Sequence, residues 1–265
     1  MSVDDEASTG GWLRLSGRAL GAIVSTAGHL AAFELDTRIK RTTSTALLPT
    51  WVPRWSRSLL SLFGVELDIE GTAGLTEPYP GRGPNGVGRV FVMNHRSAVD
   101  VLVLYATTEA QLVSRHDLAA WPGIGFGARR IGTMFVDRAS MRSGATVLKE
   151  MTRALEAGRG VALFPEGTAF GGDEVHPFRP GAFKAAIRTD AEIVPMGIAY
   201  ADEAAYFGDE TFADHVRRVG ALRHLRAALV FGEPIRPGAK KLVDLRDETR
   251  EAIQALVHRA RARLG

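Results

Sequence analysis

A histidine and an aspartate five positions apart are the first pair in the sequence that could do chemistry. They are His95 and Asp100, in the segment Asn-His-Arg-Ser-Ala-Val-Asp. On one regular helix, residues five apart point about 140° away from each other and do not meet. If His95 lies in a loop and Asp100 in the next helical turn, the carboxylate reaches the imidazole and fixes its tautomer, which leaves the other nitrogen free to accept a proton. The pair therefore predicts a general base oriented by an acid. The alternative is a histidine that only ends a strand, beside an aspartate that favours the helix N-terminus.

Two other segments bring charged residues to the ends of apolar stretches. Glu166 lies in Phe-Pro-Glu-Gly-Thr at positions 164–168, and ligands of α/β sheets collect at the carboxyl ends of strands. The flanking proline and glycine indicate a sharp turn that lets a ligand approach the backbone. Asp137 and Arg138 end the segment 132–138. Arg138 has the fork geometry that binds a phosphate, and the alternative is an ion pair with Asp137 or another carboxylate.

Taken in order along the chain, these segments resemble the motifs of the glycerolipid acyltransferases, the family that contains bacterial 1-acylglycerol-3-phosphate acyltransferases. The Asn-His-x4-Asp motif matches residues 94–100, a Gly-x-x-Phe-hydrophobic-Asp-Arg motif matches 132–138, and Phe-Pro-Glu-Gly-Thr matches 164–168. A fourth motif, an apolar strand with a proline, is similar to 193–196, and the resemblance spans residues 64–235. It implies transfer of a fatty acyl group from acyl-CoA or acyl-ACP (acyl carrier protein) to the hydroxyl of a lysolipid. The main expectation is 1-acyl-sn-glycerol-3-phosphate as acceptor, with phosphatidate as product.

The resemblance also implies a role for each residue of these motifs. His95 removes the proton of the acceptor hydroxyl, and Asp100 orients His95 and stabilises its charged form. No cofactor is implied, because the acyl thioester is a cosubstrate and no covalent acyl-enzyme forms. The residues expected to bind substrate are Asn94, Arg138, Glu166, Gly167, Thr168 and Arg179.

One position departs from the family pattern. Many phosphatidate-forming members carry an arginine directly after Glu-Gly-Thr, where it helps to hold the phosphate, whereas this chain has Ala169. A longer loop follows, with Asp173 and Glu174 before Arg179. Arg179 or Lys184 would have to supply the missing cation. Two alternatives therefore stay open: O-acylation of a phosphate-free lysolipid such as lyso-ornithine lipid, and a non-catalytic membrane lipid-binding protein of the same fold.

Alternating strand and helix patterns surround these motifs. We expect strands at 65–70, 89–93, 111–114, 133–136, 161–164, 192–198 and 227–231, and helices at 98–107, 140–156, 180–189 and 244–264. Ser97 is the expected N-cap of the helix at 98–107. Strands that alternate with helices predict an α/β fold, with a mostly parallel central sheet flanked by helices. We place this acyltransferase domain, with its C-terminal helix, at residues 64–265.

Residues 1–63 are expected to form an N-terminal amphipathic helical region. Apolar residues recur at helical spacing over 12–33, and a second short segment, 51–63, combines tryptophan with arginine. This composition suits helices in the headgroup region of a bilayer, and the alternative is a helical pair packed on the main domain. No stretch reaches the roughly 18–20 apolar residues of a spanning helix, and the acidic start argues against a secretory signal. We therefore expect a peripheral protein at the cytoplasmic face of the cell membrane, with membrane lipids as partners.

The composition excludes several classes of function. The 265 residues hold 33 basic and 30 acidic side chains, a net charge of +3 that is too small to indicate nucleic acid as a partner. The absence of cysteine excludes disulfides, thiolate metal sites and cysteine nucleophiles. Basic residues concentrate from Arg217 onward, which indicates a basic face suited to an anionic membrane. No His-x3-His pair is present, so no metal is expected. The histidines expected at the surface or in packing are His29, His116, His215, His224 and His258.

Overall fold

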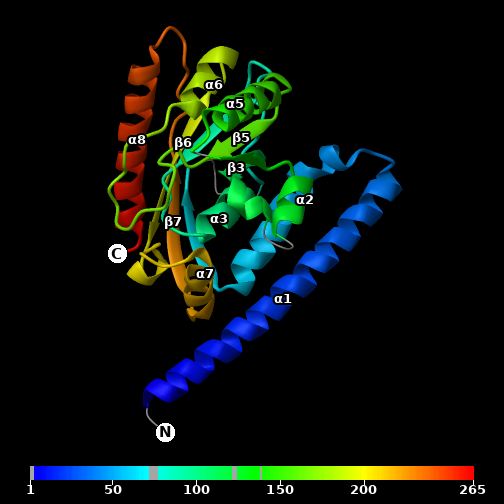
Figure 1. Ribbon diagram of the computed structural model, residues 1–265, viewed down its shortest axis with the longest axis vertical. Helices are drawn as coiled ribbons and strands as arrows, with labels where there is room; N and C mark the ends of the chain where they lie inside the picture. The colour runs from blue at the N-terminus through cyan, green and yellow to red at the C-terminus, as the bar shows by residue number, and fades with distance from the viewer. Residues whose placement is uncertain (1–2, 72–76, 121–123, 138) are drawn as a thin grey trace.

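A mostly parallel sheet forms the centre of the molecule (Figure 1). The computed structural model describes residues 3–71, 77–120, 124–137 and 139–265, and in these residues seven strands form one sheet of order β1-β7-β6-β2-β5-β3-β4. Strands β6 and β7 pair antiparallel, whereas the other neighbouring pairs are parallel. The strands are β1 (Val65–Glu70), β2 (Val90–Met93), β3 (Ala110–Arg115), β4 (Met134–Val136), β5 (Gly160–Leu163), β6 (Ile193–Tyr200) and β7 (Leu225–Phe231).

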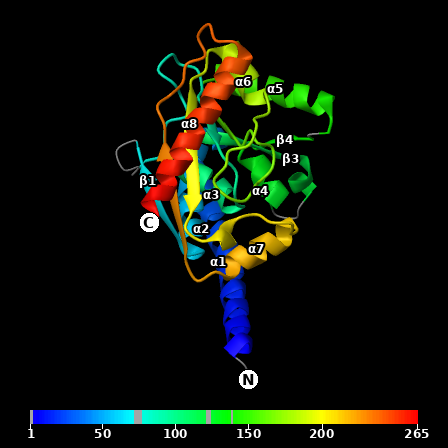
Figure 2. The same ribbon diagram turned by 90° about the vertical axis from the view of Figure 1, so that its left-hand side faces the viewer.

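Helices cover both faces of this sheet, as the two views show (Figures 1 and 2). The helices are α1 (Val3–Lys40), α2 (Ser44–Leu62), α3 (Val99–Thr107), α4 (Ile124–Arg130), α5 (Met141–Glu156), α6 (Gly181–Thr189), α7 (Phe212–Ala221) and α8 (Leu242–Arg263), with short 3-10 turns at His116–Ala120 and Glu203–Ala205. Helices α5, α6 and α8 pack on one face, and α2 and α3 pack on the other.

Strand β2 shows why the sheet needs helices on both sides. Its four residues are completely buried, and side chains alternate between the two faces of a strand. Phe91 and Met93 join the core under α3, whereas Val90 and Val92 join the core under α5 and α6. A continuous apolar run of this kind is typical of a strand covered on both faces. The end of β2 is therefore rigidly held, and the residues that follow it start from a fixed position.

The predicted α/β fold is confirmed, and no predicted strand or helix of the sheet domain differs from the observed one by more than two residues at either end. The prediction that Ser97 caps α3 is wrong, because the N-cap position is Ala98. Helix α7 was not predicted at all. It is short, and only the side of it that carries His215, Val219 and Gly220 is buried.

The N-terminal region is helical as expected, but its first helix is longer than the predicted 12–33. Helix α1 runs for 38 residues and extends past the rest of the molecule toward the N-terminus (Figure 1). Arg18 fastens it to the body, because its guanidinium donates to the carbonyls of Leu62 and Gly220. No helix in the described part of the chain is both long enough and apolar enough to cross a bilayer.

The predicted basic face after Arg217 is largely neutralised. Arg263 pairs with Asp68 and Glu70, and Arg259 also pairs with Glu70. Further ion pairs join Arg217 to Asp214, Arg218 to Glu210, Lys240 to Glu248 and Arg261 to Asp173. These cations are bound to acids of the same chain, so this region does not present the row of unpaired positive charge that the sequence suggested.

Candidate active site

His95 and Asp100 meet at the carboxyl end of β2. His95 lies in the loop after the strand, and Asp100 lies in the first turn of α3. Nδ1 of His95 is 2.8 Å from Oδ2 of Asp100. Asp100 is fully buried, whereas the His95 side chain keeps 19% of its surface exposed. Because a carboxylate only accepts hydrogen bonds, Nδ1 carries the proton and Nε2 carries the lone pair. Among the described residues none forms a hydrogen bond with Nε2, so this nitrogen is available to take a proton from a substrate.

The Asp100 carboxylate is held by four donors. Oδ2 accepts the His95 ring and also the backbone N–H groups of Arg96 (2.6 Å) and Ser97 (2.8 Å). Oδ1 accepts the hydroxyl of Tyr200, the last residue of β6, at 2.6 Å. Burial, with Asp100 as a second cause, raises the pKa of Tyr200 well above its ordinary value, so its hydroxyl stays a donor. A buried carboxylate needs several hydrogen-bond donors. These four donors hold the Asp100 carboxylate in the position from which it orients His95.

The segment 164–168 packs against the other side of His95. The ring of Phe164 stacks on the imidazole, with centroids 4.0 Å apart and planes 12° from parallel. Oε2 of Glu166 accepts the backbone N–H of His95 at 2.7 Å, and Oε1 accepts the backbone N–H of His176 at 3.0 Å. Both oxygens also accept from Nη1 of Arg96. The Glu166 side chain is fully buried, so it clamps the catalytic loop instead of contacting a lipid head as the sequence suggested.

Arg96, which the sequence did not single out, ties this clamp to the next loop. Besides Glu166, its guanidinium donates to the carbonyls of His95, Gly172 and Glu174. The residue is 1% exposed. A buried ion pair is stable only when further hydrogen bonds satisfy the charges, and these carbonyls provide them. Arg96 therefore fixes the loop after Glu166 relative to His95.

Asn94 also has a different role from the expected one. Its side chain is fully buried, and its amide exchanges two hydrogen bonds with the backbone of Ile198 (2.9 and 2.8 Å). This exchange continues the pairing of β2 with β6 one residue past the end of β2. Asn94 thus determines where the strand stops and the loop with His95 begins. The expected contact between Asn94 and substrate is replaced by this structural role.

The turn at Gly167 brings Arg179 to the site. Gly167 has a φ of +86°, and a Cβ there would lie 2.4 Å from Nε of Arg179. The backbone conformation therefore favours glycine, and any other residue would also have to displace the Arg179 side chain. Arg179 is exposed and forms no ion pair with a described residue, while Thr168 next to the turn is exposed. Arg179 is thus the described cation beside the turn, whereas Arg138, the predicted phosphate ligand, lies outside the described residues.

The two acids of the loop after Ala169 differ in their surroundings. Asp173 pairs with Arg261 (2.7 and 2.8 Å) and accepts the hydroxyl of Tyr206 at 3.1 Å. The bond to Arg261 is the main reason why the pKa of Asp173 is lowered. Glu174 is exposed. Asp173 is therefore already neutralised by the protein, which weakens the expectation that it meets a cationic head group.

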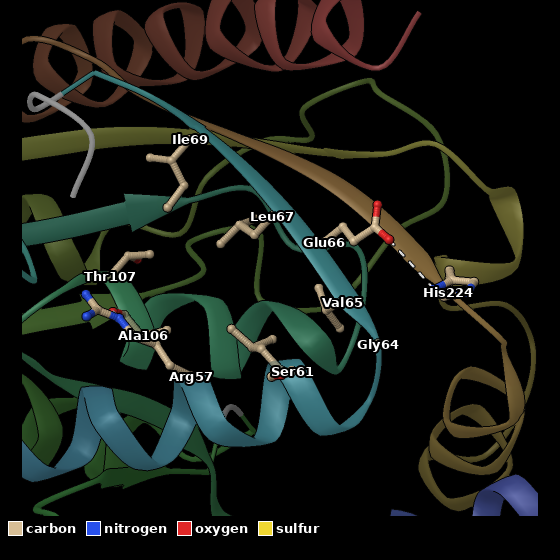
Figure 3. Close-up of a pocket in the computed structure, with 11 residues that line it drawn as sticks. Arg57, Ser61, Gly64, Val65, Glu66, Leu67, Ile69, Ala106, Thr107 and His224 are labelled. Carbon is tan, nitrogen blue, oxygen red and sulfur yellow. Dashed lines mark hydrogen bonds and ion pairs between the residues drawn. The ribbon is translucent and has the colours of Figure 1, made fainter. Parts of the chain in front are cut away.

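One hollow lies near this region, and a second lies apart from it. One, of about 570 Å³, borders the loop after Glu166 at Gly172 and is lined by the acids Glu203, Asp209 and Glu210 together with Arg218. The other, of about 400 Å³, lies between α2, β1 and the end of α3 (Figure 3). An ion pair of 3.7 Å between His224 and Glu66 lies beside it. Strand β1 is three strands away from β2, and none of the predicted site residues lines this second cavity.

His215 was expected at the surface or in packing, and the structure places it in packing. Its ring is completely buried and contacts Ser97 and Ala98, the two residues before α3. Arg96, Tyr200 and His215 carried no separate sequence signal, because their partners are far away in the chain. In the described part of the chain no three histidine, aspartate or glutamate side chains converge on a possible metal site.

Comparisons with known proteins place this geometry in context. Residues 81–199 match the Acyltransferase family model. The chain is 26% identical to a lyso-ornithine lipid O-acyltransferase of Pseudomonas aeruginosa over 247 residues, covering 91% of this chain and 90% of that protein. It is 28% identical to a 1-acyl-sn-glycerol-3-phosphate acyltransferase of Neisseria gonorrhoeae over 120 residues, about half of each protein (45% and 46%). The fold resembles the crystal structure of the 1-acyl-sn-glycerophosphate acyltransferase PlsC from Thermotoga maritima, with a TM-score of 0.72, 18% identity and coverage of 97% and 98%.

Proposed function

The chain belongs to the glycerolipid acyltransferase family, and we propose that it transfers a fatty acyl group from an acyl thioester to the hydroxyl of a lysolipid. One observation carries the mechanism: Nδ1 of His95 is bonded to buried Asp100, and Nε2 has no partner among the described residues. A neutral imidazole held in this way is suited to general base catalysis. The buried, fully bonded residues around it argue for a preorganised site and against a lipid-binding protein without catalysis.

The proposed reaction needs one proton carrier. Nε2 of His95 takes the proton of the acceptor hydroxyl as the oxygen attacks the carbonyl carbon of the thioester. The tetrahedral intermediate collapses with cleavage of the carbon–sulfur bond, and the thiolate leaves with the proton that His95 held. Asp100 stabilises the imidazolium between these steps. The products are the acylated lipid and the free thiol of CoA or acyl carrier protein, so no cofactor enters the balance.

We propose 1-acyl-sn-glycerol-3-phosphate as the acceptor, and Arg179 as the described side chain that meets its phosphate. Its guanidinium lies over the Gly167 turn and has no ion-pair partner among the described residues. Arginine binds phosphate bidentately. Arg179 would therefore supply the positive charge that many phosphatidate-forming members of the family have at the position of Ala169. Arg138 remains a second proposed ligand.

Lyso-ornithine lipid is the second candidate acceptor, and two observations favour it. The relative that acylates lyso-ornithine lipid matches nearly the whole chain, whereas the relative that acylates 1-acyl-sn-glycerol-3-phosphate matches about half. The 570 Å³ hollow beside Gly172 carries three acids and one arginine. A hollow with this charge suits an amine, and the amine of an ornithine head group has this chemistry.

We propose that the protein associates with the surface of the cytoplasmic membrane and that α1 makes the contact. Apolar side chains of α1 face solvent, with 66% of Trp12, 68% of Ile23 and 70% of Ile39 exposed. An exposed apolar surface of this extent is typical of an interaction site, and on a single long helix beside a lipid enzyme it suits a bilayer. We therefore propose that the apolar side chains of α1, and not the C-terminal cations, provide most of the binding to the bilayer.

An acceptor panel tests the proposed function. Purified protein is given radiolabelled acyl-CoA or acyl-ACP and, in parallel, 1-acyl-sn-glycerol-3-phosphate, lyso-ornithine lipid and lysophosphatidylcholine in mixed micelles. We expect acyl transfer to the first acceptor, and a rise of its KM in an Arg179→Gln variant with little change in donor KM. Preference for lyso-ornithine lipid would support the second candidate. Absence of transfer from either donor to any acceptor would contradict the proposal.

A further inference from the structure

Helix α7 places a second histidine, His215, against the loop that carries His95, and this one is fully buried. Nε2 of His215 is 3.1 Å from the backbone nitrogen of Ala98 and 3.2 Å from Oγ of Ser97. On the other side of the ring, Nδ1 is 3.0 Å from Oε1 of Glu210. The ring of Phe207 stacks on it at a centroid distance of 4.3 Å. His215 therefore sits between the start of α3 and an acid of the preceding loop.

These partners determine the protonation of the ring. The N–H of Ala98 can only donate, so Nε2 must accept and carries no proton. The Glu210 carboxylate can only accept, so Nδ1 carries the proton. Nη2 of Arg218 also lies near Nδ1, but its two hydrogens are bonded to the Tyr206 carbonyl and to Glu210. The ring is therefore neutral, and burial lowers its pKa against the opposing effect of Glu210.

The contact completes the N-terminus of α3. The first N–H groups of a helix need acceptors from outside the helix. Asp100 accepts the N–H groups of Arg96 and Ser97, and the N-cap residue Ala98 has no side-chain acceptor of its own. His215 supplies the missing acceptor for Ala98. A proton on Nε2 would remove that acceptor and would place a positive charge at the positive end of the helix.

We propose that His215 is a positioning residue of the acyl-transfer reaction, which holds the loop 95–98, and through it the Asp100–His95 pair, by accepting the Ala98 N–H with a neutral ring. The inference rests on the proposed function for its kinetic consequence, but the contact itself is independent of the substrate. His215 does not touch the reacting atoms. Its effect is on the orientation of His95, and a misplacement of about 1 Å in an active site can lower a rate roughly 100-fold.

Charged groups on two sides of the ring affect how it responds to pH. Glu210 and Arg218 lie at Nδ1, and Asp100 lies beyond Nε2 in α3. Burial lowers the pKa of His215, so this ring takes up its proton only further into the acid range. There the loss of the acceptor for Ala98 should add one proton to the acid limb of the wild-type kcat profile.

Two variants of similar size separate positioning from packing. His215→Gln keeps an oxygen at the place of Nε2, whereas His215→Leu fills the space without an acceptor. We expect His215→Leu to lower kcat roughly 10- to 100-fold with unchanged KM values, and His215→Gln to stay within about 5-fold and to lose one proton from the acid limb. His224→Gln, at an exposed histidine that pairs with Glu66 and has no hydrogen bond or ion pair with the His95 loop in the described part of the chain, is the control and should behave as the wild type.

Hydrogen exchange of the Ala98 amide gives a reading without substrate. The amide should exchange faster in His215→Leu than in the wild type, and should stay protected in His215→Gln. Equal loss of kcat in both folded variants, or unchanged Ala98 exchange in His215→Leu, would overturn the inference. A wild-type protein that acylates no lysolipid would contradict the proposed function instead, and the exchange measurement would still decide the role of His215.

Discussion

Most polar side chains around His95 form all of their hydrogen bonds within the protein. Asp100, Glu166, Arg96 and Asn94 are all buried, and their polar atoms are bonded to the protein. In contrast to these four residues, His95 keeps one ring nitrogen without a described partner. Unpaired buried charges are costly, so the network also excludes alternative positions of the loop. The site thus leaves one imidazole nitrogen of His95 without a described partner and fixes the tautomer of the ring.

Tyr200 offers a direct test of this network. A Tyr200→Phe substitution removes one of the four donors to Asp100 and leaves the packing of the ring in place. A hydrogen bond to a charged group contributes about 1.5–3 kcal/mol, and we expect kcat to fall roughly 10-fold with unchanged KM, because Tyr200 does not reach the substrate. Steady-state kinetics with varied donor and acceptor measure both constants. A kcat within twofold of the wild type would show that Asp100 is held without Tyr200.

Residue spacing predicted part of this site and missed the rest for a physical reason. His95 and Asp100 are close in sequence, so a loop followed by a helix was enough to predict their contact. Tyr200 bonds Asp100 from 100 residues away, and His215 bonds Ser97 from 118 residues away. Only the sheet order and the position of α7 bring them there. Glu166 was found, but its role was misjudged because the sequence does not reveal the buried Arg96 beneath it.

At the scale of elements, local sequence patterns predicted the strands of the sheet well. They predicted the helices around the sheet less completely. Strand β2 is a continuous apolar run, so its boundaries were predictable to within a residue. Helix α1 exceeds the predicted 12–33 because its periodicity does not end there and nothing in the sequence stops it before residue 40. Helix α7 has few buried side chains, and a short helix of this kind is stabilised by its tertiary contacts rather than by its own pattern.

Helix α1 carries a prediction about membrane binding. Ile23 and Val24 are 68% and 62% exposed, and each apolar side chain moved from water into a bilayer gains on the order of 1 kcal/mol or more. The double variant Ile23→Ser, Val24→Ser should therefore bind phosphatidylglycerol-containing vesicles roughly 10-fold more weakly in co-sedimentation. Raising the salt should have a smaller effect than these substitutions, because most of the C-terminal cations are ion-paired.

The matched control for this test removes exposed apolar side chains elsewhere. Ile187 in α6 and Val243 in α8 are 37% and 53% exposed, and the double variant Ile187→Ser, Val243→Ser should leave vesicle binding unchanged. If both double variants bind vesicles as the wild type does, α1 is not the membrane-contact surface. If the control weakens binding as much as the α1 variant does, the effect is not specific to α1.

For the whole molecule, the buried and paired groups predict a loss of stability in acid. Burial holds the pKa of His215 below its ordinary value of 6.5, so the unfolded chain takes up this proton first as the pH falls. Arg218, and secondly His215, lower the pKa of Glu210 from 4.5 to about 2, so the unfolded chain again binds the proton first. Stability falls wherever the unfolded state binds more protons. The free energy of unfolding should therefore decrease below about pH 6.5 and decrease further from pH 4.5 toward 2.

Calorimetric melting between pH 7.5 and 4 measures this dependence. The Tm of the wild type should fall as the pH is lowered, and the fall just below pH 6.5 should be smaller in His215→Gln, which has no ring to protonate. The His224→Gln control should follow the wild type. A Tm that stays constant or rises on acidification would contradict the assigned neutral state of His215.

The most direct test of the central claim is the rate of acyl transfer by a variant without the imidazole of His95. His95→Gln keeps a polar side chain in the loop but removes the base, and general base catalysis contributes on the order of 10²- to 10⁴-fold. With the preferred lysolipid and thioester at saturation, we predict that kcat falls by about this factor while the variant still unfolds in one cooperative transition, because Asp100 keeps three of its four donors. A folded His95→Gln protein whose kcat stays within tenfold of the wild type would show that His95 is not the base.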